Sequence, residues 1–232
     1  YFDPDNPYNF ALYASIGANV ALTHSLTISG DFEANIYTTF TKDKRVSNSV
    51  LPHVRTDFVS YYQQGKNGIA ALEANYFTKL SPDVYAVGRA GYLESEFAGA
   101  GGEILWQPPH QRWALGASLY GVEQRDFNRL FGLRDYKVIT GHVGLYYASP
   151  IHGLDFALYA GRYLAGDYGA TFEVRRHFDN GVEIGVYATL TNVPFHEFGE
   201  GSFDKGFIIR IPLDSLAPVN TQRMLNLDFT PL

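Results

Sequence analysis

Apolar and polar side chains alternate along most of this chain. Residues 182–191 show the pattern clearly, because Val182, Ile184 and Val186 alternate with more polar positions. Successive side chains of a β-strand point to opposite faces, so each such run has one apolar face and one polar face. The pattern recurs about a dozen times, with no helical stripe of comparable length. It predicts an all-β protein.

The alternation predicts twelve strands. They cover residues 9–22, 26–37, 54–62, 69–78, 84–93, 98–106, 113–122, 136–147, 154–163, 169–178, 182–192 and 206–213. The turn Asp179-Asn180-Gly181 supports one of these boundaries, because Asn and Gly accept the positive φ of a two-residue hairpin. A weaker alternation over residues 224–230 could be a thirteenth strand or an exit segment, and fourteen strands are also allowed.

Strand length separates a membrane barrel from a soluble β-sandwich. Most of the runs match the roughly 9–11 residues that cross a bilayer at a tilt, whereas strands of globular proteins average about 5–6. No run approaches the roughly 18 apolar residues of a transmembrane helix, and the mean hydropathy is −0.14. We therefore expect residues 1–232 to form a single antiparallel, up-and-down transmembrane β-barrel of the outer membrane.

Composition supports this class. Aromatic residues make up 16% of the chain, with 17 Tyr and 17 Phe, which suits aromatic girdles at two membrane interfaces. The net charge of −6 has both signs interspersed, so a nucleic-acid partner is disfavoured. Residues 1–4 carry neither the charged nor the apolar region of a signal peptide. We expect a mature chain or a piece of a longer protein.

The connections suggest an orientation. If both termini lie on the periplasmic side, the short connections 107–112, 149–153 and 179–181 fall on that side. The mostly longer connections 123–135, 164–168 and 193–205 then fall outside, as in known outer-membrane barrels. Residues 39–53 do not fit, because this long segment falls on the periplasmic side. Either a strand has been missed or the segment is a specialised inner loop.

Ionisable and aromatic residues on the polar faces of the strands are candidates to line the lumen. These are Asp31, Glu33, Arg55, Asp57, Glu73, Arg89, Glu103, Tyr120, His142, Tyr159, Glu173, Arg175, Glu183, Tyr187 and Arg210. Tyr13, Tyr37 and Tyr146 alternate onto the same side. The charged residues could pair and fill the interior, or they could line a hydrated path. Aromatic rings beside carboxylates and Arg suit the C–H faces and hydroxyls of sugars.

A second charged set falls in the predicted outer loops. It comprises Arg125, Asp126, Arg134, Asp135, Arg162, Asp167, Glu200, Asp204 and Lys205. Ion pairs between loops would explain these residues, and a gate or a ligand-binding rim is the alternative.

Catalytic and metal-binding motifs are absent from the sequence. There is no His-Glu-x-x-His helix, Cys cluster, G-x-S-x-G turn or phosphate-binding G-x-x-x-x-G-K motif. We therefore expect no catalytic residue, no metal and no cofactor. A barrel enzyme with His142 or His177 beside a Ser remains a less favoured alternative.

Several segments resemble a known family. They are Gln124-Arg125-Asp126-Phe127, Phe131-Gly132-Leu133-Arg134-Asp135-Tyr136, Thr140-Gly141-His142, residues 161–171 and residues 197–206. These segments are similar to the YjbH/GfcD-like family of exopolysaccharide (capsule) biosynthesis proteins, closely over about 92–213 and more loosely before. The resemblance implies the C-terminal barrel region of an outer-membrane protein that works beside a periplasmic or outer-membrane polysaccharide export protein. It supplies no catalytic residues.

The leading hypothesis is a non-enzymatic barrel in the outer membrane of a Gram-negative bacterium. It would contact outer-membrane lipid and provide or support a polar path for the secretion of an anionic or neutral exopolysaccharide. Twelve strands lie between filled eight-stranded barrels and open 16- to 18-stranded pores, so the strand number leaves an open lumen undecided. The alternatives are a plugged barrel whose residues 39–53 dock an export partner, and a barrel hydrolase or lipid-modifying enzyme.

Overall fold

The computed structural model describes residues 10–39, 57–194, 203–212 and 224–229. Its elements are β1 (Ala11–Ala21), β2 (Leu26–Thr38), α1 (Phe58–Gln64), β3 (Asn67–Ser81), β4 (Val84–Tyr92), β5 (Phe97–Trp106), β6 (Trp113–Arg125), β7 (Leu133–Ala148), β8 (Leu154–Arg162), β9 (Tyr168–His177), β10 (Glu183–Thr191), β11 (Asp204–Pro212) and β12 (Met224–Phe229). None of the described helices has the length and apolar character needed to cross a membrane.

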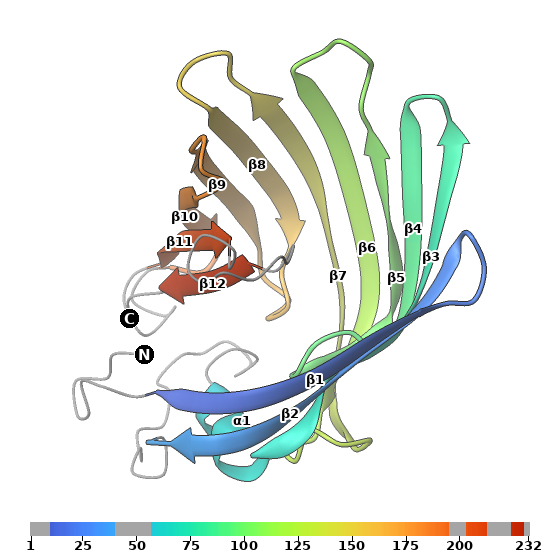
Figure 1. The fold of residues 1–232 in the computed structure, drawn as a ribbon, viewed down its shortest axis with the longest axis vertical. Helices are drawn as coiled ribbons and strands as arrows, with labels where there is room; N and C mark the ends of the chain where they lie inside the picture. The colour runs from blue at the N-terminus through green and yellow to red at the C-terminus, as the bar shows by residue number, and fades with distance from the viewer. Residues whose placement is uncertain (1–9, 40–56, 195–202, 213–223, 230–232) are drawn as a thin grey trace.

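The strands form one sheet in chain order, from β1 to β12, and the paired neighbours run antiparallel. Figure 1 shows the sheet curving round so that its two edge strands approach the same side of the molecule. No ladder joins β12 to β1 within the described ranges. We call the concave face of the sheet lumenal and the convex face outer. The structure confirms the predicted all-β, up-and-down architecture.

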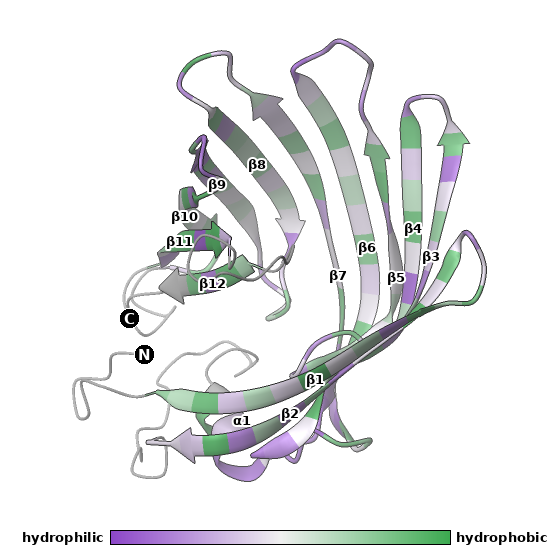
Figure 2. Cartoon of the chain, in the orientation of Figure 1, coloured by the Kyte–Doolittle hydropathy of each residue, from purple (hydrophilic) through white to green (hydrophobic). Residues whose placement is uncertain are grey.

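The register places the apolar side of each strand on the outer face. Ile16, Leu119 and Val186 lie there with 79%, 63% and 54% of their surface exposed. Along the strands in Figure 2, hydrophobic positions alternate with more polar ones. Glu183 and Tyr187 alternate with Val186 and so take the opposite, lumenal face. The predicted direction of this strand is correct.

One predicted strand is wrong. Of residues 54–62, positions 54–56 lie outside the described part, and the rest form the start of α1, whose last turn is closed by the Gly65 amide donating to the Tyr61 carbonyl. Tyr61 is 4% exposed, and its hydroxyl donates to the Arg125 carbonyl across 2.6 Å. This contact is made to a residue 64 positions away, so alternation in a short window did not indicate it. The weak pattern near the C-terminus does form β12, so the described ranges contain twelve strands.

Because residues 57–62 do not form a strand, each later connection falls at the opposite end of the sheet from the one predicted. The short connections 22–25, 82–83, 107–112, 149–153 and 178–182 lie at one end, which we call the turn end. The strand ends that flank residues 39–66, 93–96, 126–132, 163–167 and 192–203 lie at the other, which we call the loop end. The first residue of β1 and the last of β12 lie at the loop end, so the expectation that the short connections share the side of the termini is wrong. β2 ends and β3 begins at this same loop end.

A β-bulge corrects one further residue. Tyr13 pairs with Asn35, but Leu12 pairs with Tyr37, so Ile36 is an extra residue in β2. The bulge turns Tyr37 to the side of Leu12, where its ring lies 5.5 Å from that of Phe10 and 55% of the residue is exposed. Tyr37 is therefore on the outer face, contrary to the prediction from alternation.

A small apolar cluster fills the interior near the loop end. Phe97, Val122 and Val138 are buried there, and Leu93 and Leu164 pack against them. These side chains come from β5, β6 and β7 and from the adjoining loops, so they narrow the lumen at this end.

Candidate functional site

A cavity of about 970 Å³ lies against the lumenal side of the middle strands. Its lining includes Tyr120, Tyr146, Tyr159 and Tyr163 together with His142. Strands β3 to β9 contribute to it, so the site is formed by residues almost a hundred positions apart.

Three of these tyrosine rings lie over glycine positions of their own or a neighbouring strand. A Cβ atom on Gly101 would lie 2.4 Å from a ring carbon of Tyr120. A Cβ atom on Gly144 would lie 2.9 Å from the Tyr146 hydroxyl and 3.2 Å from a ring carbon of Tyr159. The rings therefore lean along the wall into space that a side chain would otherwise occupy, and together they give the cavity an aromatic wall.

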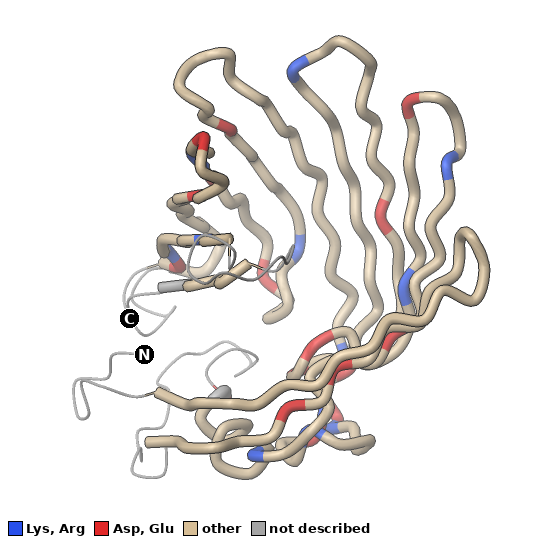
Figure 3. The backbone as a smooth tube through the Cα atoms, viewed as in Figure 1, with Lys and Arg blue, Asp and Glu red and all other residues tan. Residues whose placement is uncertain are grey.

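Charged groups face the same cavity. Arg89 Nε lies 3.8 Å from Glu103 Oε1, and the Tyr120 hydroxyl donates to the same oxygen across 2.7 Å. Glu73 and Glu94 also line the cavity, so its three carboxylates outnumber its one guanidinium group. Figure 3 shows acidic and basic positions interspersed along the strands, with several of each near α1. The cavity thus combines aromatic faces with an excess of negative charge.

His142 lies within the aromatic wall, at a level between Tyr120, which pairs with Thr140, and Tyr159, which pairs with Gly144. Its ring lies 4.6 Å from that of Tyr163, and its backbone amide donates to Ser118 Oγ across 3.2 Å. The imidazole Nε2 is buried and has no hydrogen-bond partner within the described part of the chain. The hydrogen bond thus joins Ser118 to the backbone of His142. A hydrolase would instead pair the serine hydroxyl with the imidazole.

Hydroxyl groups extend this polar surface toward β10. The hydroxyls of Tyr163 and Thr171 lie 2.6 Å apart, and those of Thr171 and Thr189 lie 2.8 Å apart. The next strand continues the row, because the Tyr187 hydroxyl donates to Asp204 across 3.3 Å. Polar side chains therefore follow one another from the β8–β9 connection across β9 and β10 to β11 on the lumenal face.

A row of paired acidic and basic side chains crosses the lumenal face of β8 to β11 at the turn end. His177 Nε2 lies 2.8 Å from Asp155, its Nδ1 lies 3.3 Å from Glu183, and Glu183 lies 3.4 Å from Arg210. Arg175 also pairs with Glu173. These side chains pair with one another. Of the two alternatives for the lumenal charges, mutual pairing or the lining of a hydrated path, this group follows the first.

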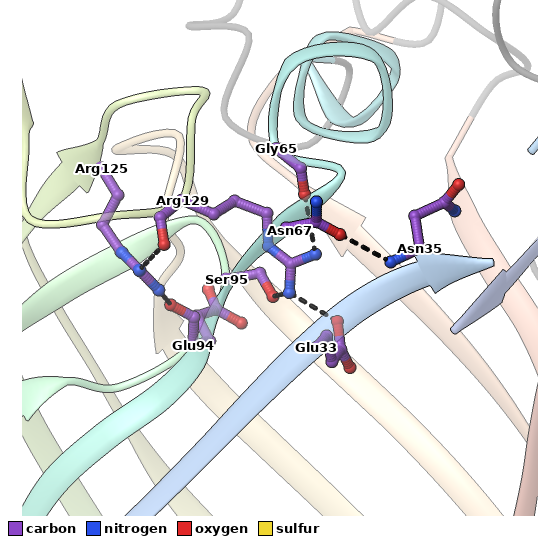
Figure 4. Close-up of polar contacts among 8 residues, drawn as sticks. All are labelled: Glu33, Asn35, Gly65, Asn67, Glu94, Ser95, Arg125 and Arg129. Atoms are coloured by element: carbon purple, nitrogen blue, oxygen red, sulfur yellow. Dashed lines mark hydrogen bonds and ion pairs between the residues drawn. The ribbon is translucent and has the colours of Figure 1, made fainter. Parts of the chain in front are cut away.

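A compact group at the loop end, α1 together with residues 126–132, forms what we call the inner cap. Arg129 is 4% exposed and donates to Glu33 on β2 across 2.5 Å and to Ser95 across 2.9 Å. A Cβ atom on Gly65 or Gly68 would approach Arg129 within 2.5–2.6 Å, so both glycines leave room for it. Figure 4 shows the Arg129 guanidinium reaching between the end of α1 and β2. The loop between β6 and β7 is thereby held against strands much earlier in the chain.

Arg125, at the end of β6, also holds this loop in place through its side chain. It is completely buried, and its guanidinium donates to the carbonyls of Glu94, Arg129 and Leu130 at 2.6, 2.8 and 3.1 Å. Its positive charge is also 4.8 Å from the centre of the Tyr92 ring. A buried guanidinium needs several acceptors, and here the loop backbone supplies them.

The predicted lumenal residues mostly take lumenal register positions. This holds for Asp31, Glu33, Glu73, Arg89, Glu103, Tyr120, His142, Tyr159, Glu173, Arg175, Glu183, Tyr187 and Arg210. Asp57 is wrong as a strand residue, because it is the N-cap residue of α1; its carboxylate accepts a hydrogen bond from Gln124 across 3.3 Å. Arg55 lies outside the described residues.

The predicted outer-loop residues separate into three groups. Arg125 and Arg162 end strands, and Arg134, Asp135, Asp204 and Lys205 belong to β7 and β11, so none of these six is a loop residue. Asp126 and Asp167 do lie in connections, and Glu200 falls outside the described residues. The ion pair of Lys137 with Glu123, at 3.0 Å, lies on the outer face of the same region.

Several contributors could not be selected from the sequence. Tyr163 and Thr171 were not singled out, and the contact of Arg129 with Glu33 spans 96 positions. The glycines under the tyrosine rings carry one local signal, since a glycine within a strand often marks a close approach. The partner at each glycine depends on the register between strands.

Comparison with known proteins then identifies the family. A family model described as "Exopolysaccharide biosynthesis protein YbjH" matches residues 1–232. The chain belongs to the YjbH family. Its sequence is 38% identical over 237 residues to the "Uncharacterized lipoprotein YjbH" of Escherichia coli (strain K12). No solved structure matches.

The match to the YjbH family member of Escherichia coli covers 99% of this chain and 34% of that protein. The chain therefore spans about a third of the length of the curated relative it matches. The resemblance noted in the sequence is correct, and the family is one of exopolysaccharide biosynthesis.

Proposed function

We propose that this chain forms the wall of an outer-membrane β-barrel that offers an exopolysaccharide a polar, aromatic-lined path. One observation carries the proposal: the cavity of about 970 Å³, with its tyrosines and carboxylates, lies inside a sheet whose outer face is apolar. Many weak contacts of this kind suit a polymer that must keep moving, because tight binding would stall it.

The outer face supports the membrane assignment. At the turn end, the rings of Trp106 and Trp113 pack edge to face 5.1 Å apart, as expected for an interfacial girdle. At the loop end, the ion pair of Lys137 with Glu123 ends the apolar stretch of β6 and β7. The stretch between them matches the roughly 9–11 residues of a tilted membrane strand.

The family supports the proposed setting, because it is one of exopolysaccharide biosynthesis. The proposed location is the outer membrane of a Gram-negative bacterium, in contact with lipid. The proposed partners are the exopolysaccharide and a periplasmic or outer-membrane export protein, which hands the polymer on. The proposed role is non-enzymatic.

The inner cap favours a second candidate. Arg125 and Arg129 hold the loop between β6 and β7 against β2 and β3, as a plug would be held. In that case the barrel is a scaffold for the export partner, and the cap closes the path. The docking segment proposed for this scaffold, residues 39–53, lies almost wholly outside the described residues.

Reconstitution separates the two candidates. The purified protein is inserted into planar bilayers, and conductance and its block by a neutral glucan oligosaccharide are recorded. The path predicts conductance that the oligosaccharide interrupts. If the inserted wild type is silent and the Arg129→Met variant conducts, the plugged scaffold is correct. An inserted protein that is silent in both forms and binds no oligosaccharide overturns the path.

A further inference from the structure

The aromatic wall of the cavity also indicates which sugars it accepts. We propose that Tyr120, Tyr146 and Tyr159 form a stacking surface for pyranose rings without negative charge. The inference rests on the proposed saccharide path and narrows it, since the sequence alone allowed an anionic or a neutral polymer.

The first argument is the placement of the rings. Tyr120, Tyr146 and Tyr159 stand on the consecutive strands β6, β7 and β8, and all three line the cavity. The Tyr146 and Tyr159 rings lie 5.6 Å apart at an interplanar angle of 77°. Rings that lean over Gly101, Gly116 and Gly144 are supported by the backbone beneath them. A sugar can then stack without first ordering a free side chain.

The second argument is the set of polar groups beside the rings. The Glu103 carboxylate already accepts from Tyr120 and has remaining lone pairs for a sugar hydroxyl. The tyrosine hydroxyls of the same wall can both donate and accept, and the His142 ring lines the cavity beside them. A pyranose hydroxyl also both donates and accepts, so these groups can pair with it.

The third argument is charge. The cavity lining holds the carboxylates of Glu73, Glu94 and Glu103 and one guanidinium, that of Arg89, which lies 3.8 Å from Glu103. The Arg125 guanidinium lies next to Glu94 but does not line the cavity, so Glu73 contributes most to the excess of negative charge. A uronate would bring a further carboxylate into a space with low-dielectric walls, where repulsion between like charges is strong. A neutral sugar avoids this repulsion, and an amine-bearing sugar gains attraction.

Three oligosaccharides of matched length test the proposal. Binding to the purified protein is measured for maltoheptaose, hepta-galacturonate and a chitosan heptamer, by calorimetry at low ionic strength and again at high salt. We expect galacturonate to bind about tenfold more weakly than maltoheptaose at low salt. High salt should reduce the difference in affinity between galacturonate and maltoheptaose, because screening weakens the repulsion between galacturonate and the carboxylates of the cavity.

Variants locate the effect. The double variant Glu73→Gln, Glu103→Gln should bring galacturonate close to maltoheptaose, whereas Glu123→Gln, which alters a carboxylate on the outer face, should leave the difference unchanged. Tyr146→Leu should weaken maltoheptaose several-fold, and Tyr147→Leu, on the outer face, should not. Galacturonate binding as tightly as maltoheptaose overturns the charge inference but leaves the path. Failure of all three sugars to bind the folded, inserted protein overturns the path itself.

Discussion

Arg129 donates to the Glu33 carboxylate across 2.5 Å and thereby joins the loop between β6 and β7 to β2. The arginine is 4% exposed at its side chain, whereas the glutamate is 29% exposed, so only the cation is fully enclosed. Gly65, Gly68 and Ser95 surround the arginine. This pair acts together with the Ile69 amide, which donates to the Arg129 carbonyl across 2.9 Å and joins the same loop to β3.

Removing the cation should loosen the inner cap. Arg129→Met keeps much of the stem but leaves the Glu33 carboxylate without its partner, so we expect a loss of about 2–3 kcal/mol in unfolding free energy. Urea unfolding of the protein in detergent micelles measures it. Arg134→Met is the matched control, because Arg134 is 41% exposed and 4.0 Å from Asp126. That control should cost at most about 1 kcal/mol, and equal losses in both variants would contradict the assigned role of Arg129.

Tyr61 should make the protein sensitive to alkali. Burial raises the pKa of the Tyr61 phenol above its ordinary value of 10.0, and the nearby Glu96 carboxylate raises it further. The folded protein therefore holds this proton more tightly than the unfolded chain does. The resulting stability is fully present below about pH 10 and is lost as the pH rises beyond it.

The Tyr61→Phe variant should show a smaller loss of stability between neutral pH and about pH 11 than the wild type. At neutral pH it should be less stable by about 1 kcal/mol, because the hydrogen bond to the Arg125 carbonyl is missing. Tyr168→Phe, at a residue 58% exposed, serves as the control and should follow the wild-type curve. Parallel alkaline curves for Tyr61→Phe and wild type would show that another group dominates.

Gly144→Ala should disturb the aromatic wall without removing a ring. Its new Cβ would lie 2.9 Å from the Tyr146 hydroxyl and 3.2 Å from Tyr159, so both flexible side chains must shift. We expect maltoheptaose affinity to fall several-fold. Gly121→Ala is the matched control on the outer face of β6, where a Cβ would meet nothing within 4 Å. Unchanged affinity in Gly144→Ala, with the rings shown to have moved, would exclude stacking on them.

Leu119→Arg tests the membrane face. Leu119 is 63% exposed on the outer face, while its neighbour Ser118 lines the cavity. An arginine at the middle of a lipid-facing strand costs about 2–4 kcal/mol, so Leu119→Arg should insert poorly into vesicles of outer-membrane lipids. Ser118→Arg places the same charge in the wet interior and should insert more efficiently. Equal insertion of the two would argue against a lipid-facing wall.

Local alternation sufficed to predict most strands and the direction of their faces. Val186 and Tyr187 fall on opposite sides because the pleat alternates with every residue, whatever the rest of the chain does. The same rule failed at Tyr37, where one extra residue in β2 changes the face, and at α1, where burial of Tyr61 against Arg125 outweighs a short alternating pattern.

The sequence by itself determined that this chain is a long-stranded antiparallel sheet with an apolar outer face. Several of its segments also showed the resemblance to the YjbH family. Only the tertiary structure decided which end carries the long connections, how Arg125 and Arg129 hold the inner cap, and which glycines lie under Tyr120 and Tyr146. The pleat is a property of neighbouring residues, and so it is legible in the sequence. A buried guanidinium and a ring over a glycine depend on register between strands, which is set when distant segments pack together.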